Sequence, residues 1–327
     1  MRLAVSGKID DEFLAYARQV GATDYIGGGN DLPTDKGYFG FQELMLLRQR
    51  IENAGLRWAV LDGIPAGWKH KIKLGLPGRD EQIANWCRTL ENMGAAGIPA
   101  LGYFFSLRSG VGHYGLRTSR TTPGRGGAKV TSFAYELIEG ADQGFWDPPV
   151  DRSVEATDDD VWGYLSYFLE AVIPIAEQAG VRMGVHPDDP PVSPIGGVAR
   201  VLRSHAALRR LTEIVPSDSN CLGFCQGTIS EMPEDILDAI RYFGSRNKIC
   251  YVHFRNVSGT VPSFSETFID EGHVDMLEAM SAYRDVGYDG PIIDDHVPDM
   301  GGSERQYRSH AFAMGYMRAL VQAVNAG

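Results

Sequence analysis

Eight short apolar segments recur along this chain, and a longer stretch with helical spacing of its apolar residues follows each of them. The segments are rich in Val, Ile, Tyr and Phe and are nearly continuous in apolar character, which is typical of strands buried on both faces. Alternation of this kind predicts parallel strands joined by crossover helices. The expected strands span residues 3–6, 23–27, 58–62, 100–105, 182–186, 222–225, 249–254 and 291–295.

Apolar stripes mark several of the helices. One begins behind Gly78, another runs from about Asp158 to Gly180, a third ends at Gly287, and the last covers about 304–324. Eight strands that each precede a helix predict a closed (β/α)8 barrel, with a doubly wound open sheet as the alternative. A length of 327 residues is ordinary for one such barrel, so we expect a single domain over residues 1–327.

Composition narrows the function classes. The formal net charge of −11 argues against a general affinity for nucleic acid or anionic membrane, although a basic pocket for a small anion remains compatible with it. No segment approaches the about 18 apolar residues of a membrane span, and the N-terminal apolar run is too short for a signal peptide. The four cysteines show no CxxC spacing. We expect a cytoplasmic enzyme of a small molecule, with homo-oligomers common in this class.

The connection after the fourth expected strand is unusually long. About 50 residues precede the helix near Asp158, and residues 107–130 hold five basic side chains, His113, six glycines and no acid. Loops of this length are functional or disordered more often than not. We predict that the 107–155 insertion forms a basic lid over the barrel mouth.

Four successive expected strands end in a side chain that can bind a metal ion: His186, Cys225, His253 and Asp295. The carboxyl ends of neighbouring barrel strands lie close together, so these side chains can converge on one ion. Two imidazoles, a thiolate and a carboxylate would neutralise a divalent cation. Taken singly, each residue also has a structural explanation, such as a buried cysteine or a hydrogen-bonded histidine, but the recurrence at four strand ends favours a metal site.

Two further residues lie beside these ends. His296 follows Asp295 directly and suits proton transfer near neutral pH, with helix capping as the structural alternative. Arg255 lies two residues beyond His253 and could bind a substrate carboxylate through two hydrogen bonds, with a surface salt bridge as the alternative.

The motifs around these positions resemble those of the mannonate dehydratases. They are His186-Pro-Asp-Asp-Pro-Pro, Cys225-x-Gly-Thr, His253-Phe-Arg-Asn and Asp295-His296, and further likeness covers Ile72-Lys73-Leu74-Gly75, Phe264-x-Glu266 and Gly272-x-x-Asp275-Met276. The likeness covers most of the chain and is strongest after residue 180.

The resemblance implies a barrel of the xylose isomerase type that holds Mn²⁺ or a similar divalent ion such as Fe²⁺. It implies the same four ligands and assigns proton transfer to His296 and Tyr307. The substrate-binding residues that we expect are Arg255, Asn256, Arg117 and Lys73.

The chain departs from the family pattern at three places. Lys69-His70-Lys71 stands where the family reads His-Glu-Asp, Arg117-Thr118 lacks the preceding family tryptophan, and Asp294 replaces a proline before Asp295. The substrate-facing rim in the first half of the barrel is therefore expected to differ more than the metal site.

The resemblance implies dehydration of D-mannonate to 2-keto-3-deoxy-D-gluconate. A divalent ion that chelates the carboxylate and 2-hydroxyl would stabilise the enediolate, while a base takes the C2 proton and an acid protonates the departing hydroxyl. A metal-dependent sugar isomerase or epimerase on the same barrel is the alternative enzyme. A non-catalytic sugar-acid binding protein with a structural metal is a third hypothesis.

Overall fold

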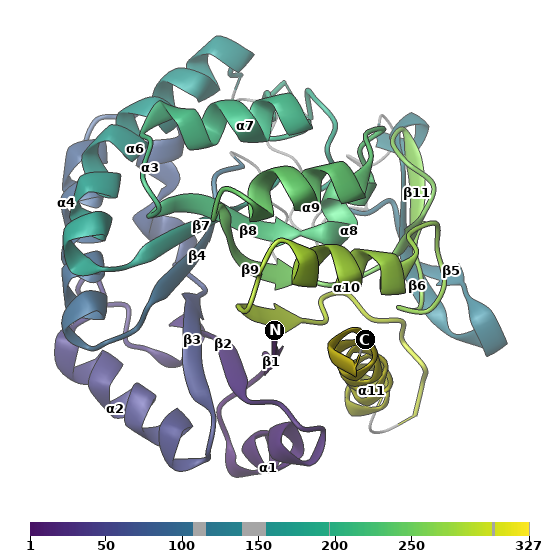
Figure 1. Cartoon of the computed structure of the whole chain (residues 1–327). Coiled ribbons are helices and arrows are strands. Elements are labelled where there is room, and N and C mark those ends of the chain that lie inside the picture. The colour runs from purple at the N-terminus through teal and green to yellow at the C-terminus, as the bar shows by residue number, and fades with distance from the viewer. Residues whose placement is uncertain (107–115, 139–154, 196, 303–304, 327) are drawn as a thin grey trace.

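A computed structural model describes residues 1–106, 116–138, 155–195, 197–302 and 305–326 of the chain. Within them, eight parallel strands close into a barrel in the order β1-β12-β9-β8-β7-β4-β3-β2 (Figure 1). The prediction of a (β/α)8 barrel is therefore confirmed, and the open-sheet alternative is wrong. The barrel strands are β1 (Arg2–Val5), β2 (Asp24–Gly28), β3 (Arg57–Asp62), β4 (Ala100–Phe104), β7 (Arg182–His186), β8 (Asn220–Cys225), β9 (Ile249–His253) and β12 (Pro291–Ile293).

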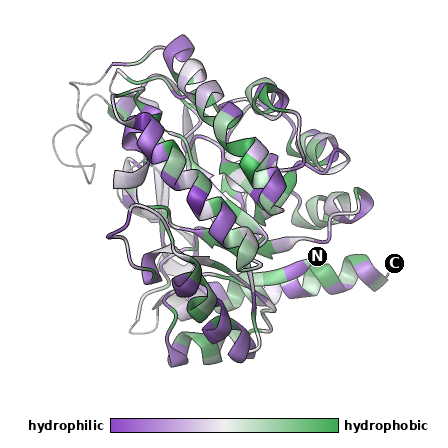
Figure 2. Cartoon of the chain, turned by 90° about the vertical axis from the view of Figure 1, so that its left-hand side faces the viewer, coloured by the Kyte–Doolittle hydropathy of each residue, from purple (hydrophilic) through white to green (hydrophobic). Residues whose placement is uncertain are grey.

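Helices surround the barrel, and Figure 2 shows hydrophilic and hydrophobic residues alternating along them, as expected of helices with one buried face. Helix α6 begins and ends where the sequence predicts. Thr157 and Asp160 form a capping box at its start, and Gly180, with φ 68°, follows its last residue. None of the described helices is long and apolar enough to cross a membrane. The helices are α1 (Asp11–Gln19), α2 (Phe41–Asn53), α3 (His70–Lys73), α4 (Arg79–Ala95), α6 (Asp158–Ala179), α7 (His205–Ile214), α8 (Gln226–Ser230), α9 (Ile236–Gly244), α10 (Met276–Asp285) and α11 (Arg305–Ala326).

The last barrel strand is shorter than expected. It ends at Ile293, whereas the sequence predicts a strand through Asp295. Asp294 and Asp295 lie beyond the strand, and their carboxylates contact other side chains. The Asp294 carboxylate lies 2.6 Å from His310 Nδ1, and Asp295 accepts a hydrogen bond from Arg255.

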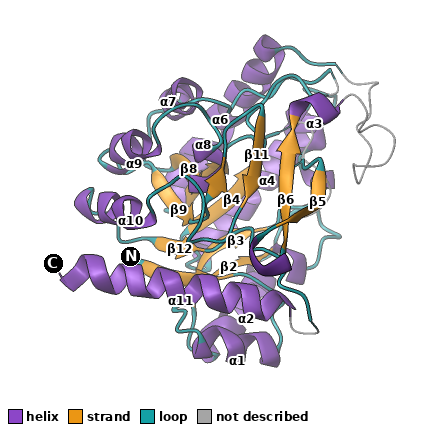
Figure 3. Cartoon of the chain, turned by 90° about the vertical axis from the view of Figure 1, so that its right-hand side faces the viewer, coloured by secondary structure: helices purple, strands orange, loops and turns teal. Residues whose placement is uncertain are grey.

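A second, four-stranded sheet stands beside the barrel (Figure 3). Two of its strands lie in the long insertion, and β6 pairs with β11 from the loop after β9. Lys129 in β6 also exchanges two backbone hydrogen bonds with Asp299, in the loop that follows β12. The strands are β5 (Ser119–Pro123), β6 (Lys129–Ala134), β10 (Val257–Ser258) and β11 (Ser263–Glu266).

The described part of the insertion is thus a hairpin anchored to two site-bearing loops. The rest, residues 107–115 and 139–154, lies outside the described residues. The basic lid and the single-domain organisation over residues 1–327 therefore stay predictions.

Three glycines on adjacent strands make room for one large side chain inside the barrel. Tyr251 of β9 is fully buried, and an added Cβ at Gly102, Gly184 or Gly223 would lie 2.5–2.9 Å from its nearest atom. Only hydrogen at these positions leaves space for the ring. The glycines of β4, β7 and β8 are therefore a packing requirement of the barrel interior.

Gly223→Ala should lower the free energy of unfolding by about 1–3 kcal/mol, the usual cost of overpacking, because its Cβ would lie 2.5 Å from Tyr251 Oη. Gly163→Ala is the matched control: the added Cβ in α6 meets nothing within 4 Å, and alanine favours the helix by about 1 kcal/mol. Denaturant unfolding of both variants measures the difference. Equal stability of Gly223→Ala and wild type would contradict this packing.

Candidate functional site

The four predicted ligand side chains meet at the carboxyl ends of their strands. His186 ends β7, Cys225 ends β8, His253 ends β9 and Asp295 follows β12. One potential ligand atom from each lies within 4.8 Å of those of the other three. Cys225 pairs with His253 in the β8–β9 register, which brings the thiol and the imidazole to one level.

The geometry and the donor set fit a divalent metal ion. His186 Nδ1 lies 2.7 Å from the carbonyl oxygen of Pro187, which leaves Nε2 as the ligand atom and fixes the ring. His253 Nδ1 is buried without a hydrogen-bond partner among the described residues and lies 3.5 Å from Asp295 Oδ1. A buried nitrogen in this state is satisfied when it coordinates an ion. The mixture of imidazole, thiolate and carboxylate is suited to a transition ion.

The surroundings of Cys225 favour its thiolate form. Burial opposes ionisation, but Arg255 and His186 outweigh it and hold the pKa of Cys225 well below its usual value. Thr228, in α8 immediately after the cysteine, donates to Sγ from its backbone N–H at 3.4 Å and lies 3.1 Å from it through Oγ1. The thiolate is the form of cysteine that binds metal.

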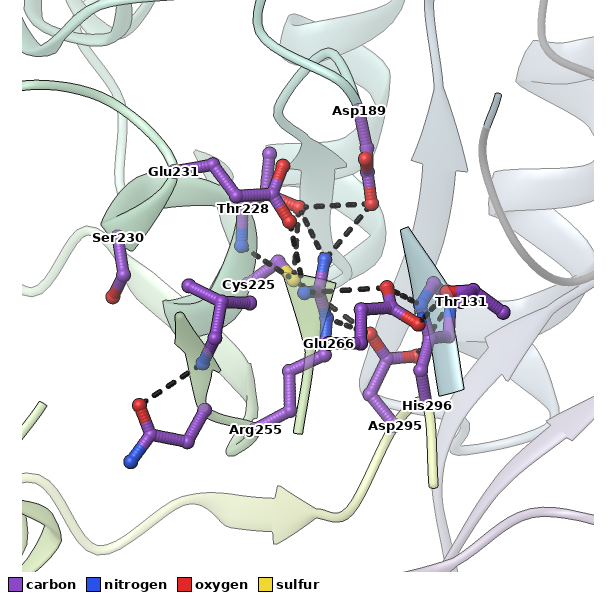
Figure 4. Close-up of polar contacts among 12 residues, drawn as sticks. Thr131, Asp189, Cys225, Thr228, Ser230, Glu231, Arg255, Glu266, Asp295 and His296 are labelled. Carbon is purple, nitrogen blue, oxygen red and sulfur yellow. Dashed lines mark hydrogen bonds and ion pairs between the residues drawn. The ribbon is translucent and has the colours of Figure 1, made fainter. Parts of the chain in front are cut away.

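Arg255 lies at the centre of the site and bonds to protein acceptors on every side (Figure 4). Its Nε donates to Asp295 Oδ2 at 2.8 Å, its Nη1 to Glu231 at 2.9 Å, and its Nη2 to Asp189 at 2.8 Å and Thr228 at 3.0 Å. The side chain is 3% exposed. The guanidinium therefore supports a candidate ligand and is no surface salt bridge, and its contact with a substrate carboxylate stays a prediction.

Arg117 has the same character. Its side chain is fully buried and forms a bidentate pair with Asp189, at 2.5 and 2.9 Å, and a second pair with Glu266. These carboxylates hold the pKa of Arg117 above its usual value despite burial. Asp189, Glu266 and His296 also bring potential ligand atoms within 4.8 Å of one another, but the Arg117 cation already bonds to both carboxylates.

Asn256 stabilises the loop after β9. Its Nδ2 donates to the carbonyl of Val274 at 2.9 Å, and its Oδ1 accepts from the N–H groups of Val257 and Val274. Both ends of the amide are bonded to backbone, so Asn256 holds the loop, and its contact with a substrate stays a prediction.

His296 is buried beside the ligand cluster. Its Nδ1 forms a short hydrogen bond with Glu266 Oε1, and its Nε2 lies 3.7 Å from Asp295 Oδ1. Burial lowers the pKa of His296, but Asp295 and Glu266 outweigh it and raise the pKa overall. Thr131 of β6 also hydrogen-bonds to Glu266, so the hairpin helps to hold the histidine.

Tyr307 and Lys73 contact different parts of the barrel, Tyr307 the helix α1 and Lys73 the segment after β4. The Tyr307 ring packs against Tyr16 of α1, with centroids 4.7 Å apart, and its carbonyl accepts from the Tyr16 hydroxyl. These contacts give no support to a position beside His296, and the catalytic role of Tyr307 stays a prediction. Lys73 is buried and donates to the carbonyl of Ser106 at 2.7 Å, just after β4.

Sequence reasoning gave no role to three carboxylates of this site. Asp189 and Glu266 lie in motifs that resemble the family, so their positions were visible although their partners were not. Glu231 follows α8 and carries no motif. Its burial and the neighbouring Asp189 raise its pKa well above the ordinary value, and Arg255 donates to it.

The sequence is similar to that of known mannonate dehydratases over nearly its whole length. A sequence profile described as D-mannonate dehydratase (UxuA) matches residues 1–146 and 149–326. A mannonate dehydratase of Thermotoga maritima is 32% identical, with 97% of this chain and 95% of the relative covered. Mannonate dehydratase 2 of Halalkalibacterium halodurans is 30% identical, with 99% and 100% covered.

Solved structures extend the likeness to three dimensions. The mannonate dehydratase of Streptococcus suis serotype 2 superposes with a TM-score of 0.86 at 28% identity and covers all of this chain and 95% of that one. An L-ribulose 3-epimerase shares the fold, at a TM-score of 0.62 and 15% identity over 99% of this chain and 96% of that chain. The chain belongs to the D-mannonate dehydratase family.

Proposed function

We propose that this enzyme dehydrates a sugar acid, with D-mannonate as substrate and 2-keto-3-deoxy-D-gluconate and water as products. The observation that carries the proposal is the convergence of His186, Cys225, His253 and Asp295 beside a buried histidine. Those four side chains would hold Mn²⁺ or Fe²⁺. When bound, the ion would stabilise negative charge on the substrate carboxylate during removal of the C2 proton.

His296 would transfer the proton at Nε2. Its Nδ1 is bonded to Glu266, which fixes the ring and directs the other nitrogen toward Asp295. Arg255 would keep the Asp295 carboxylate in place through Nε. The second proton-transfer group assigned from the resemblance, Tyr307, has no comparable geometric support. We also expect a homo-oligomer in the cytoplasm, which size-exclusion chromatography and fractionation would test.

Chelation should abolish formation of the 2-keto acid from D-mannonate, and Mn²⁺ or Fe²⁺ should restore it, because the ion would supply the positive charge that stabilises the deprotonated substrate. The measurement is product formation by metal-free and reconstituted enzyme. Undiminished turnover in a preparation shown to lack metal would overturn the proposal. Conversion to an isomeric sugar without a 2-keto-3-deoxy product would favour the isomerase or epimerase alternative.

Cys225→Ser should strongly reduce bound metal while the fold stays intact, because a serine hydroxyl does not replace a thiolate ligand near neutral pH. Cys221→Ser is the matched control: its Sγ lies 3.4 Å from the carbonyl of Met183, away from the ligand set. Elemental analysis of both variants, with circular dichroism for folding, gives the comparison. The same metal content in Cys225→Ser and wild type would show that the ligand set is wrong.

His296→Asn should keep stoichiometric metal but lose about 10²- to 10⁴-fold in kcat, the usual range for a lost general acid or base. Asp295→Asn, one residue earlier, should instead lose metal first. Metal content and kcat measured on both variants separate the two roles. If His296→Asn loses its metal or retains near-normal kcat, the proton-transfer role is wrong.

A further inference from the structure

Two lysines lie one helical turn apart at the barrel mouth. Lys69 belongs to the Lys69-His70-Lys71 segment that departs from the family pattern, and Lys73 to the adjoining Ile72-Lys73-Leu74-Gly75 motif that resembles it. Lys69 immediately precedes α3, and Lys73 is its last residue. Lys73 is buried, and Lys69 is half-buried. Cations three or four residues apart on one helix face repel each other, and burial increases the cost of each charge. Burial lowers the pKa of both lysines, and Lys69 lowers the pKa of Lys73 further. Asp62 and Asp188 act in the opposite direction on Lys69 and Lys73 respectively, but burial outweighs them.

The protein provides little compensation for these charges. Lys73 Nζ donates to the uncharged carbonyl of Ser106. Lys69 Nζ forms no hydrogen bond or ion pair within the described ranges, and the carboxylate that attracts it at longer range is Asp62, the last residue of β3. Two half-buried or buried ammonium groups therefore lack a carboxylate in direct contact.

The other nearby carboxylate is already engaged. Asp188 accepts hydrogen bonds from the Ser106 hydroxyl and from the backbone N–H of Leu202, and Arg200 Nη2 lies 3.9 Å from it. Counted together, Lys69, Lys73 and Arg200 outnumber Asp62 and Asp188. Among the residues that the structure describes, the β3–β4 side of the mouth thus carries an excess of positive charge.

This side adjoins the ligand cluster. Asp188 lies two residues after His186, and the ring of Phe104, at the end of β4, packs against His186 with centroids 4.5 Å apart. The Lys73 ammonium group donates to the carbonyl of Ser106, which lies two residues after the end of β4. A molecule bound at the ligand cluster would extend toward the lysines across two neighbouring strand ends.

We propose that Lys69 and Lys73 form a subsite for a second anionic group, a carboxylate or a phosphate, at the end of the sugar acid remote from the reacting carboxylate. The inference rests on the proposed function for the orientation of the substrate. A terminal anion would neutralise the lysine pair and satisfy Lys69. The chain would then prefer a doubly charged sugar acid over D-mannonate itself.

The test uses Mn²⁺-loaded enzyme that carries His296→Asn, a variant expected to keep its metal with strongly reduced turnover, so the wild-type lysines and each lysine substitution are compared in this background. Calorimetry measures the binding of three probes: D-mannonate, the six-carbon diacid D-mannarate, and D-mannonate 6-phosphate. At low ionic strength, at least one of the two probes with a second anionic group should bind about tenfold more tightly than D-mannonate, and added salt should reduce that preference. The tighter of the two names the terminal group. Lys69→Met should abolish the preference and leave metal content and D-mannonate affinity within about twofold.

Lys71→Met is the control, since this lysine lies two positions away with its Nζ beside Gly78, and it should keep the wild-type preference. Equal affinity for all three probes with the wild-type lysines would overturn the subsite. So would equal weakening of all three by Lys69→Met, because the lysines would then hold the carboxylate that the probes share. Binding is read without turnover, so a preference for a doubly charged probe without dehydration of D-mannonate would refute the proposed function alone.

Discussion

The buried guanidinium of Arg255 is the interaction on which the site depends. It bonds to Asp295 after β12, Glu231 after α8 and Asp189 after β7, and thereby connects three separate segments of the barrel mouth. Removal of one partner from a buried ion pair costs about 3–5 kcal/mol, because the remaining charge is left uncompensated. The same cation lowers the pKa of Cys225 against the effect of burial. One positive charge thus orients a carboxylate ligand and, together with His186, favours the thiolate form of a cysteine ligand.

A second arginine extends this arrangement to the acid/base side. Arg117 comes from the long insertion and binds both Asp189, which it shares with Arg255, and Glu266, which holds His296. The proton-transfer residue and the ligand cluster are therefore linked through a continuous set of buried charges. The hairpin is part of the site for this reason, whatever the remainder of the insertion does.

The fold and the candidate ligands could be predicted because they depend on local patterns. Buried parallel strands are readable as apolar runs, and a ligand at a strand end is found by its position in the run, as for His186 and Cys225. The roles of Arg255 and Arg117 could not be read in this way. The carboxylates that accept from Arg255 lie 24 to 66 residues away along the chain, and those that accept from Arg117 lie 72 to 149 residues away. No spacing rule reports such pairs. A substrate contact was the natural expectation for an arginine beside a ligand.

We propose that the Cys225 thiolate joins two imidazoles and a carboxylate around one ion. X-ray absorption at the manganese K edge of the Mn²⁺-loaded enzyme tests it most directly, because sulfur scatters differently from nitrogen and oxygen. We predict one sulfur neighbour, from Cys225, together with a shell of nitrogen and oxygen neighbours. A spectrum fitted by nitrogen and oxygen alone would contradict the ligand set, since Cys225 Sγ lies 3.7 Å from Asp295 Oδ2 within the same cluster.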